Sequence, residues 1–274
     1  MLAAMIRLHV DDDGAGAPSG GPVFVLLHGF TTDGTAWAPV RAALRRFGRT
    51  VAVDLIGHGR SPAPEDVSAY TMTACLAQLD GVLEALGLPA AWWVGYSMGA
   101  RVALQMVANR PHRVRGLIVE SGTAGLETAA ERARRAAEDE TLARRIEAVG
   151  VAAFVEEWLA RPLFAGLARL PPEQRAAQRE RRLKNSARGL AHSLRGMGTG
   201  AMAPLWSALA DVRVPTLFIA GEQDAKFVAI ARRMSGLVPG SLCVAVPGSG
   251  HTVHAEQPEA WMAAAVKFLE DSLA

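Results

Sequence analysis

The pentapeptide Gly95-Tyr96-Ser97-Met98-Gly99 decides the fold of this chain. It lies between the apolar run 90–94, which is typical of a strand, and the helix-like stretch 100–107. A G-x-S-x-G sequence at a strand-to-helix junction is typical of a nucleophile elbow, in which a strained turn lifts the serine hydroxyl clear of the sheet. Glycines flank the serine because a side chain there would collide with the neighbouring strand and helix. The same pentapeptide also occurs by chance as a glycine-rich turn, so its context must decide.

That context comes from three other strand ends. The apolar run 23–27 leads into His28-Gly29-Phe30-Thr31, a loop of the kind that supplies an oxyanion-hole amide. The strand-like run 215–220 is followed by Asp224, and the run 242–246 is followed by His251. The chain order Ser, Asp, His is the order found in α/β-hydrolases, so the sequence predicts a Ser97-His251-Asp224 triad on that fold.

The distribution of strands and helices predicts the architecture. Before position 120, short apolar strands alternate with amphipathic helices, which indicates a mostly parallel sheet with helices on both faces. Between about 123 and 203 the strand signals vanish and prolines divide a helical, arginine-rich segment. The alternation returns after Pro204. We therefore expect a hydrolase core formed by residues 1–122 and 204–274, with an inserted helical cap at 123–203.

Composition limits the function classes. The chain has 274 residues, enough for one large core, and its net charge of +2 gives no reason to expect a nucleic-acid or membrane partner. Cys75 and Cys243 lie in apolar stretches and are expected to be buried free thiols. No set of histidines, cysteines and carboxylates has metal-ligand spacing, so neither a metal nor another cofactor is expected. The lack of a secretory or membrane-spanning pattern predicts a cytoplasmic protein. The sequence does not indicate an oligomeric state.

The triad predicts definite roles. A serine hydroxyl is protonated at neutral pH and needs a base, for which His251 is the candidate. Asp224 would fix the tautomer of His251 and stabilise its imidazolium form. The amides of Phe30 and Met98 would stabilise an oxyanion or an enolate. His254, close to His251 in sequence, is interpreted as structural.

The arginines suggest an anionic ligand. Arg101 lies four residues after Ser97, about one helical turn into the following helix, from where it could reach the pocket. A buried arginine is costly without an anion, whereas an arginine on the outer face of the helix would need none. Both placements remain open from the sequence. Arginines in the segment 123–203 are usually solvated, but if several converged on one pocket they would bind carboxylates.

A set of motifs spread over nearly the whole chain, some of them in the arginine-rich segment, points to a more specific assignment. They are 95–101, 120–126, Arg132, Arg135, Asp139, Trp158, 161–164, Arg182, 189–191, 221–227, Gly250, His251, His254, Glu256 and Pro258. In these residues the sequence resembles a known family, the 2-succinyl-6-hydroxy-2,4-cyclohexadiene-1-carboxylate synthases of menaquinone biosynthesis. The chain departs from the family at Ala100, where glycine is usual, at Ala124, where proline is usual, and at Ile56, in a loop that often reads Leu-Pro-Gly-His-Gly.

The resemblance implies a lyase. Such an enzyme uses its serine triad to eliminate pyruvate from 2-succinyl-5-enolpyruvyl-6-hydroxy-3-cyclohexene-1-carboxylate, and it consumes no water. Ser97 would be the base, activated by His251 and Asp224, with the Phe30 and Met98 amides holding the developing negative charge. The family's residues that bind this polycarboxylate substrate correspond here to Arg101, Arg135 and Arg182, together with the aromatic residues Tyr96 and Trp158.

Two other classes of function compete with this interpretation. A carboxylesterase or a carbon–carbon bond hydrolase would share the triad, because a fold does not fix a reaction. Arginines that point to solvent would favour that hydrolase. A non-catalytic ligand receptor or protein-interaction module on the same fold would typically lack a triad member, and this chain has all three.

Overall fold

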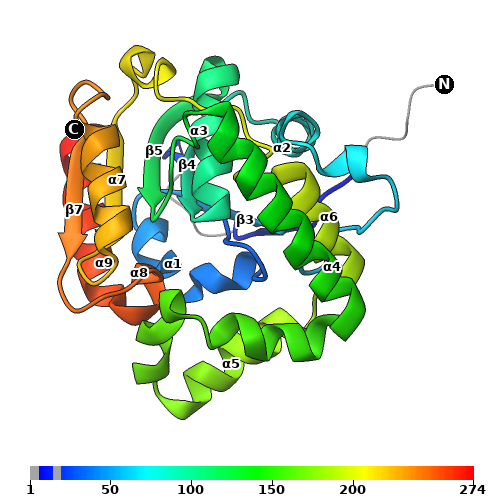
Figure 1. The fold of residues 1–274 in the computed structure, drawn as a ribbon. Coiled ribbons are helices and arrows are strands. Elements are labelled where there is room, and N and C mark those ends of the chain that lie inside the picture. Colours follow the sequence, from blue (N-terminus) through cyan, green and yellow to red (C-terminus); the bar gives the residue numbers. More distant parts are fainter. Residues whose placement is uncertain (1–5, 15–19) are drawn as a thin grey trace.

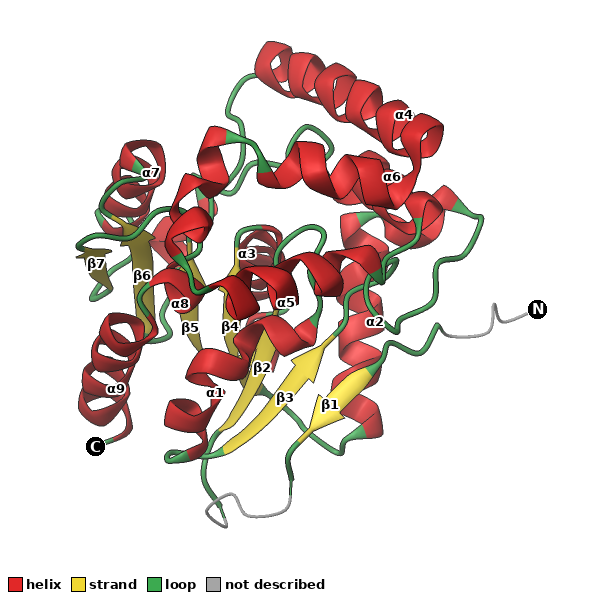
Figure 2. Ribbon diagram, turned by 90° about the horizontal axis from the view of Figure 1, so that it is seen from below, coloured by secondary structure: helices red, strands yellow, loops and turns green. Residues whose placement is uncertain are grey.

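The computed structural model describes residues 6–14 and 20–274. These residues form one sheet that helices surround (Figure 1). Its strand order, β1-β3-β2-β4-β5-β6-β7, can be followed in Figure 2. Neighbouring strands are parallel except at one edge, where β1 runs antiparallel to β3. The strands are β1 (Val10–Asp12), β2 (Val23–Leu27), β3 (Arg49–Val53), β4 (Ala91–Tyr96), β5 (Val114–Glu120), β6 (Thr216–Gly221) and β7 (Leu242–Val246). The central strand β4 is buried along its whole length, as expected for a parallel sheet covered on both faces.

Helices cover the two faces of the sheet. On one face, α1 (Ala38–Arg45) and α9 (Pro258–Leu273) contribute Leu44, Trp261 and Leu269 to an apolar cluster. On the other face, α2 (Met72–Ala85), α3 (Met98–Asn109) and α7 (Ala225–Ser235) pack against a second and larger cluster. A short helix, α8 (Val253–Glu256), precedes α9. Single turns of 3-10 helix occur at η1 (Gly34–Trp37), η2 (Val67–Tyr70), η3 (Pro111–Arg113) and η5 (Ala208–Asp211).

The segment between β5 and β6 is helical and contains no strand. It consists of α4 (Ala129–Leu159), η4 (Pro162–Arg169), α5 (Pro172–Leu183) and α6 (Ala187–Met197). A capping box formed by Thr128 and Glu131 begins α4, and Gly150 kinks it with a φ of 76°. The segment has an apolar cluster of its own, which includes Ile146, Phe154 and Leu190. In Figure 2, α4 and α6 lie beyond the carboxyl ends of the strands. The predicted fold is confirmed, while the exact division at 122/123 and 203/204 stays a prediction.

The cysteines show how position in the sheet sets exposure. Both are free thiols, as expected from the sequence. Cys75 on α2 is fully buried, and burial raises the pKa of its thiol to about 12. Cys243 is only partly buried, contrary to the expectation, because it lies on the edge strand β7. Among the described residues, no helix is both long and apolar enough to cross a membrane.

Glycines allow the close packing at the junction of β4 and α3. A Cβ atom on Gly99 would lie 2.1 Å from the carbonyl oxygen of Leu27 in β2, and a Cβ on Gly95 would lie 2.4 Å from the carbonyl oxygen of Gly99. These contacts are with backbone atoms, which cannot rotate away. Helix α3 therefore approaches the ends of β2 and β4 more closely than any residue with a side chain would allow.

We predict that Gly99→Ala lowers the free energy of unfolding by about 3 kcal/mol or more, because overpacking against backbone forces the helix off the sheet. Gly236→Ala is the matched control. Gly236 has a helical φ of −64° and only ordinary contacts, the nearest at 3.5 Å, so its substitution should change stability by less than about 1 kcal/mol. Denaturant titration of both variants measures the difference, and equal stabilities would contradict the steric argument.

Candidate active site

Ser97 forms the turn between the last residue of β4 and the first residue of α3. Its backbone has φ 51° and ψ −101°, a region that residues with a side chain rarely adopt. The backbone N–H of Ser97 donates to the carbonyl oxygen of Glu120 at 2.9 Å, which ties the turn to the neighbouring strand β5. The strained turn places the hydroxyl above the carboxyl end of the sheet, as the sequence motif predicts.

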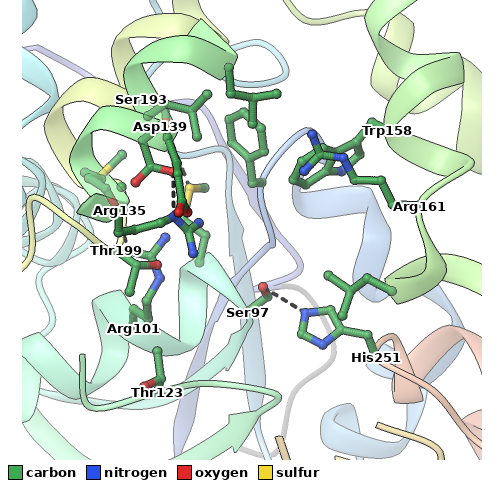
Figure 3. Close-up of a pocket in the computed structure, with 18 of the residues that line it drawn as sticks. Ser97, Arg101, Thr123, Arg135, Asp139, Trp158, Arg161, Ser193, Thr199 and His251 are labelled. Carbon is green, nitrogen blue, oxygen red and sulfur yellow. Dashed lines mark hydrogen bonds and ion pairs between the residues drawn. The ribbon is translucent and has the colours of Figure 1, made fainter. Parts of the chain in front are cut away.

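The predicted triad residues lie within hydrogen-bond distance of one another. His251 Nε2 is 3.1 Å from Ser97 Oγ, and His251 Nδ1 is 2.7 Å from Asp224 Oδ2 (Figure 3 shows Ser97 and His251). An ionised carboxylate only accepts hydrogen bonds, so Nδ1 carries the proton and Nε2 is free to accept from the serine hydroxyl. Asp224 also caps α7, where its other oxygen accepts from the Phe227 amide at 3.4 Å. This geometry is suited to proton abstraction from Ser97.

The loop that carries His251 is held by a buried carboxylate that the sequence did not single out as a site residue. Glu256, in α8, accepts from the amides on either side of the histidine: Gly250 N at 2.7 Å and Thr252 N at 3.0 Å. Ser121 Oγ donates to the carbonyl oxygen of His251 itself at 2.8 Å. The imidazole is therefore oriented through its own backbone as well as through Asp224. The only local sign of this role in the sequence is that an acidic residue, Glu256, follows five residues after His251.

Two amides beside Ser97 are available to a ligand. Neither the N–H of Phe30 nor that of Met98 donates a hydrogen bond within residues 6–14 and 20–274. The Met98 amide begins α3, where unpaired N–H groups and the helix dipole favour negative charge. Both residues line the same cavity as Ser97. An oxyanion or enolate beside the serine would meet these two donors.

A cavity of about 720 Å³ opens above Ser97. The sequence-predicted residues that line it are Phe30, Tyr96, Ser97, Met98, Arg101, Arg135, Trp158 and His251. Asp224 is not in the lining because it lies behind His251. The hydroxyl of Tyr96 pairs with Thr252 Oγ1 at 2.9 Å, so its ring is fixed as a wall of the pocket. The volume suits a small-molecule ligand.

Arg101 lies on the pocket side of α3, which answers the question that the sequence left open (Figure 3). Its Nη1 donates to the carbonyl oxygen of Met197 at 2.5 Å, and no carboxylate of a described residue lies within 4.0 Å of it. Burial, together with the nearby Arg135, lowers the pKa of Arg101 to about 10, so the group stays charged at neutral pH. A cation so placed without a carboxylate partner is suited to an anionic ligand.

Arg135 lines the cavity from α4. Its Nε donates to Asp139 Oδ1 at 2.8 Å, one helical turn further on. Asp139 is buried and was not predicted as a site residue, although the spacing of four residues on one helix was the available signal. The aspartate orients the guanidinium and leaves its other N–H groups for a ligand.

Arg182, predicted as a substrate-binding residue, is not among the residues that line the cavity. It is 1% exposed, and its Nη1 donates to the carbonyl and side-chain oxygens of Gln178, each at 2.7 Å. Tertiary contacts of the neighbouring residues explain this orientation. Asn185 Nδ2 donates to the carbonyl oxygen of Thr31 at 2.6 Å, and Arg181 Nε donates to Thr35 Oγ1 at 2.8 Å, so the end of α5 is fixed to the segment that follows β2. Arg182 is thereby turned into the interior, where burial lowers its pKa to about 10.

His254 lies outside the cavity, in agreement with its structural interpretation. Its Nδ1 is 2.9 Å from both carboxylate oxygens of Glu120, and both side chains are buried. The imidazole also packs against the rings of Trp37 and Tyr96, at centroid distances of 4.7 and 4.8 Å. Among the described residues, no group of three or more histidine, cysteine and acidic side chains is arranged to hold a metal ion.

Comparison with known proteins agrees with the fold and the site. Residues 22–258 match the family model described as alpha/beta hydrolase fold. A Bacillus subtilis (strain 168) protein, provisionally named 2-succinyl-6-hydroxy-2,4-cyclohexadiene-1-carboxylate synthase, is 40% identical over 92% of this chain and 91% of its own length. The Klebsiella pneumoniae synthase of that name is 32% identical over 91% of this chain and 94% of its own length.

Solved structures give the same result. The structure of MenH from S. aureus superimposes with a TM-score of 0.92 at 32% identity, and the match covers 97% of this chain and 99% of that one. Both the sequence and the fold are thus shared over almost the entire length. This chain therefore belongs to the alpha/beta hydrolase fold family and, within it, to the 2-succinyl-6-hydroxy-2,4-cyclohexadiene-1-carboxylate synthases.

Proposed function

We propose that this enzyme is a lyase that converts 2-succinyl-5-enolpyruvyl-6-hydroxy-3-cyclohexene-1-carboxylate into 2-succinyl-6-hydroxy-2,4-cyclohexadiene-1-carboxylate and pyruvate. The family relationship supports the reaction. The observation in the structure that carries the proposal is the guanidinium lining of the cavity above Ser97, above all Arg101, which has no carboxylate partner among the described residues. A substrate with several carboxylates fits such a cavity.

The triad geometry supports Ser97 as the base. His251 Nε2 takes the serine proton, and Asp224 stabilises the imidazolium that forms. The serine oxygen then removes the proton from ring carbon C2, which carries the succinyl group. The electron pair forms the C2–C3 double bond, the existing C3–C4 double bond moves to C4–C5, and the bond from C5 to the enolpyruvyl oxygen breaks. The leaving enolate takes up a proton and becomes pyruvate. The Phe30 and Met98 amides would hold the negative charge that develops during proton removal, a contribution often worth about 3 kcal/mol per donor.

The alternative is a carboxylesterase or carbon–carbon bond hydrolase, which would use the same triad to attack a carbonyl carbon. A neutral ester gives no compensation for the burial of Arg101, whereas a carboxylate does. The placement of Arg101 inside the cavity therefore favours the lyase.

We expect Ser97→Ala and His251→Ala each to abolish pyruvate release while the protein stays folded. Because the two residues act as one unit, the double variant should be little worse than either single variant. A coupled assay for pyruvate measures turnover, and circular dichroism measures folding. Near-normal turnover by Ser97→Ala would refute the role of Ser97 as the base.

We expect Arg101→Ala to lower kcat/KM for the enolpyruvyl substrate by roughly ten- to a hundredfold, since a hydrogen bond to a charged group contributes about 1.5–3 kcal/mol. Any hydrolysis of a neutral aryl ester should suffer much less. Arg188→Ala is the control, because Arg188 is half-exposed and paired with Glu65 outside the cavity. If the wild type hydrolyses simple esters efficiently, releases no pyruvate and tolerates loss of Arg101, the esterase is the correct function.

A further inference from the structure

Arg161 is a cation in the cavity that no part of the proposed mechanism uses. It lies at the start of η4 and lines the cavity together with Trp158 (Figure 3). Its guanidinium carbon is 4.4 Å from the centroid of the Trp158 ring. Among the described residues, no carboxylate lies within 4.0 Å of Arg161 and no acceptor takes a hydrogen bond from its side chain. Its five N–H donors are therefore available to a ligand.

The indole beneath Arg161 is held in place by other rings. The rings of Phe30, Phe154 and Phe164 surround Trp158 at centroid distances of 5.4, 5.6 and 5.5 Å. A guanidinium over an aromatic face is attracted by the ring electrons, which restricts its orientation while its N–H edge stays exposed. The aromatic cluster thus presents the cation to the cavity at a lower entropy cost than a free side chain would require.

Charge across the cavity is not balanced. In Figure 3, Arg101 and Arg135 lie on one side of Ser97, and Arg161 lies on the other side with Trp158. Partial burial and the positive charge of Arg135 lower the pKa of Arg161. Glu157 partly offsets this effect, but it already pairs with Arg145 at 2.5 Å. A negative group between these cations would relieve the repulsion.

We propose that Arg161 is a specificity-determining residue that binds a second carboxylate of the substrate, on the opposite side of Ser97 from the carboxylate bound by Arg101. This inference rests on the proposed function and adds to it. The proposed substrate carries three carboxylates, on its ring, its succinyl chain and its enolpyruvyl group. Two cationic positions on either side of the serine select molecules with two separated carboxylates.

The test is calorimetric titration of the enolpyruvyl substrate into the Ser97→Ala protein, which cannot turn it over. Adding Arg161→Gln should raise Kd roughly five- to twentyfold, less than a fully buried contact would give, because Arg161 is exposed at the cavity mouth. Arg161→Lys should recover only part of this loss, since lysine lacks the planar fork. The charge-matched control is Arg144→Gln, an exposed residue of α4 that pairs with Glu140 outside the cavity lining and should change Kd less than twofold.

An equal rise in Kd for Arg161→Gln and Arg144→Gln would overturn the inference, because it would show only a long-range attraction between the substrate and the positive charge of the protein. A Kd that neither substitution changes would also overturn it. In the otherwise native enzyme, Arg161→Gln should raise KM for pyruvate release and leave kcat within about twofold. Failure of the proposed function gives a different result: the wild type releases no pyruvate, whatever the titration shows. If the wild type releases pyruvate while Arg161→Gln leaves both Kd and KM unchanged, only the role of Arg161 is refuted.

Discussion

The close approach of α3 to the ends of β2 and β4 is the constraint on which the rest of the site depends. Only a residue without a side chain fits at Gly99, two residues after Ser97, whose own backbone has a positive φ. Because parallel strands end at one edge of the sheet, the segments that follow β2, β6 and β7 arrive beside that serine. They bring Phe30, Asp224 and His251. The strained turn is thus stabilised by the packing of the whole sheet rather than by local contacts.

The sequence predicted those site residues whose positions follow from a local pattern. Ser97, Asp224 and His251 each follow a strand, and strand ends are visible in the hydrophobic pattern. Arg101 could be placed near the pocket because one helical turn is a fixed distance, although its direction stayed open until the structure showed it. The cap was visible as a loss of strand signals. The kink at Gly150 was not predicted, because a single glycine within a helical pattern does not determine a bend.

The sequence did not predict the orientation of side chains that contacts with distant residues determine. Arg182 turns inward because the end of α5 is tied to residues far away in the sequence, and no local pattern reports such ties. Glu256 and Arg161 present the same difficulty. A glutamate in a short helix and an arginine before a proline are ordinary in sequence, and only the fold shows that one holds the loop of His251 and the other lies over Trp158. Their roles depend on geometry rather than on residue type.

The arginines of the cavity favour the binding of an anionic substrate but lower the stability of the ligand-free protein. Arg135 keeps an aspartate partner, while Arg101 has only a carbonyl oxygen. Each buried cation without a carboxylate reduces the stability of the ligand-free protein, and an anionic substrate restores part of that free energy when it binds. The ligand-free protein thus gives up some stability at these arginines in exchange for substrate binding.

Glu256 also limits how freely the cap could be exchanged between relatives. The carboxylate that holds the loop of His251 also accepts from Arg169 of η4 at 3.3 Å, and a Cβ atom on Gly166 would lie 1.8 Å from one of its oxygens. A foreign cap with a larger residue at position 166 would push this oxygen away from the Gly250 amide. The core and the cap of this enzyme are therefore not independent modules. A chimaera that carries another cap has to keep a glycine at position 166, so that Glu256 can still hold the loop of His251 in the core.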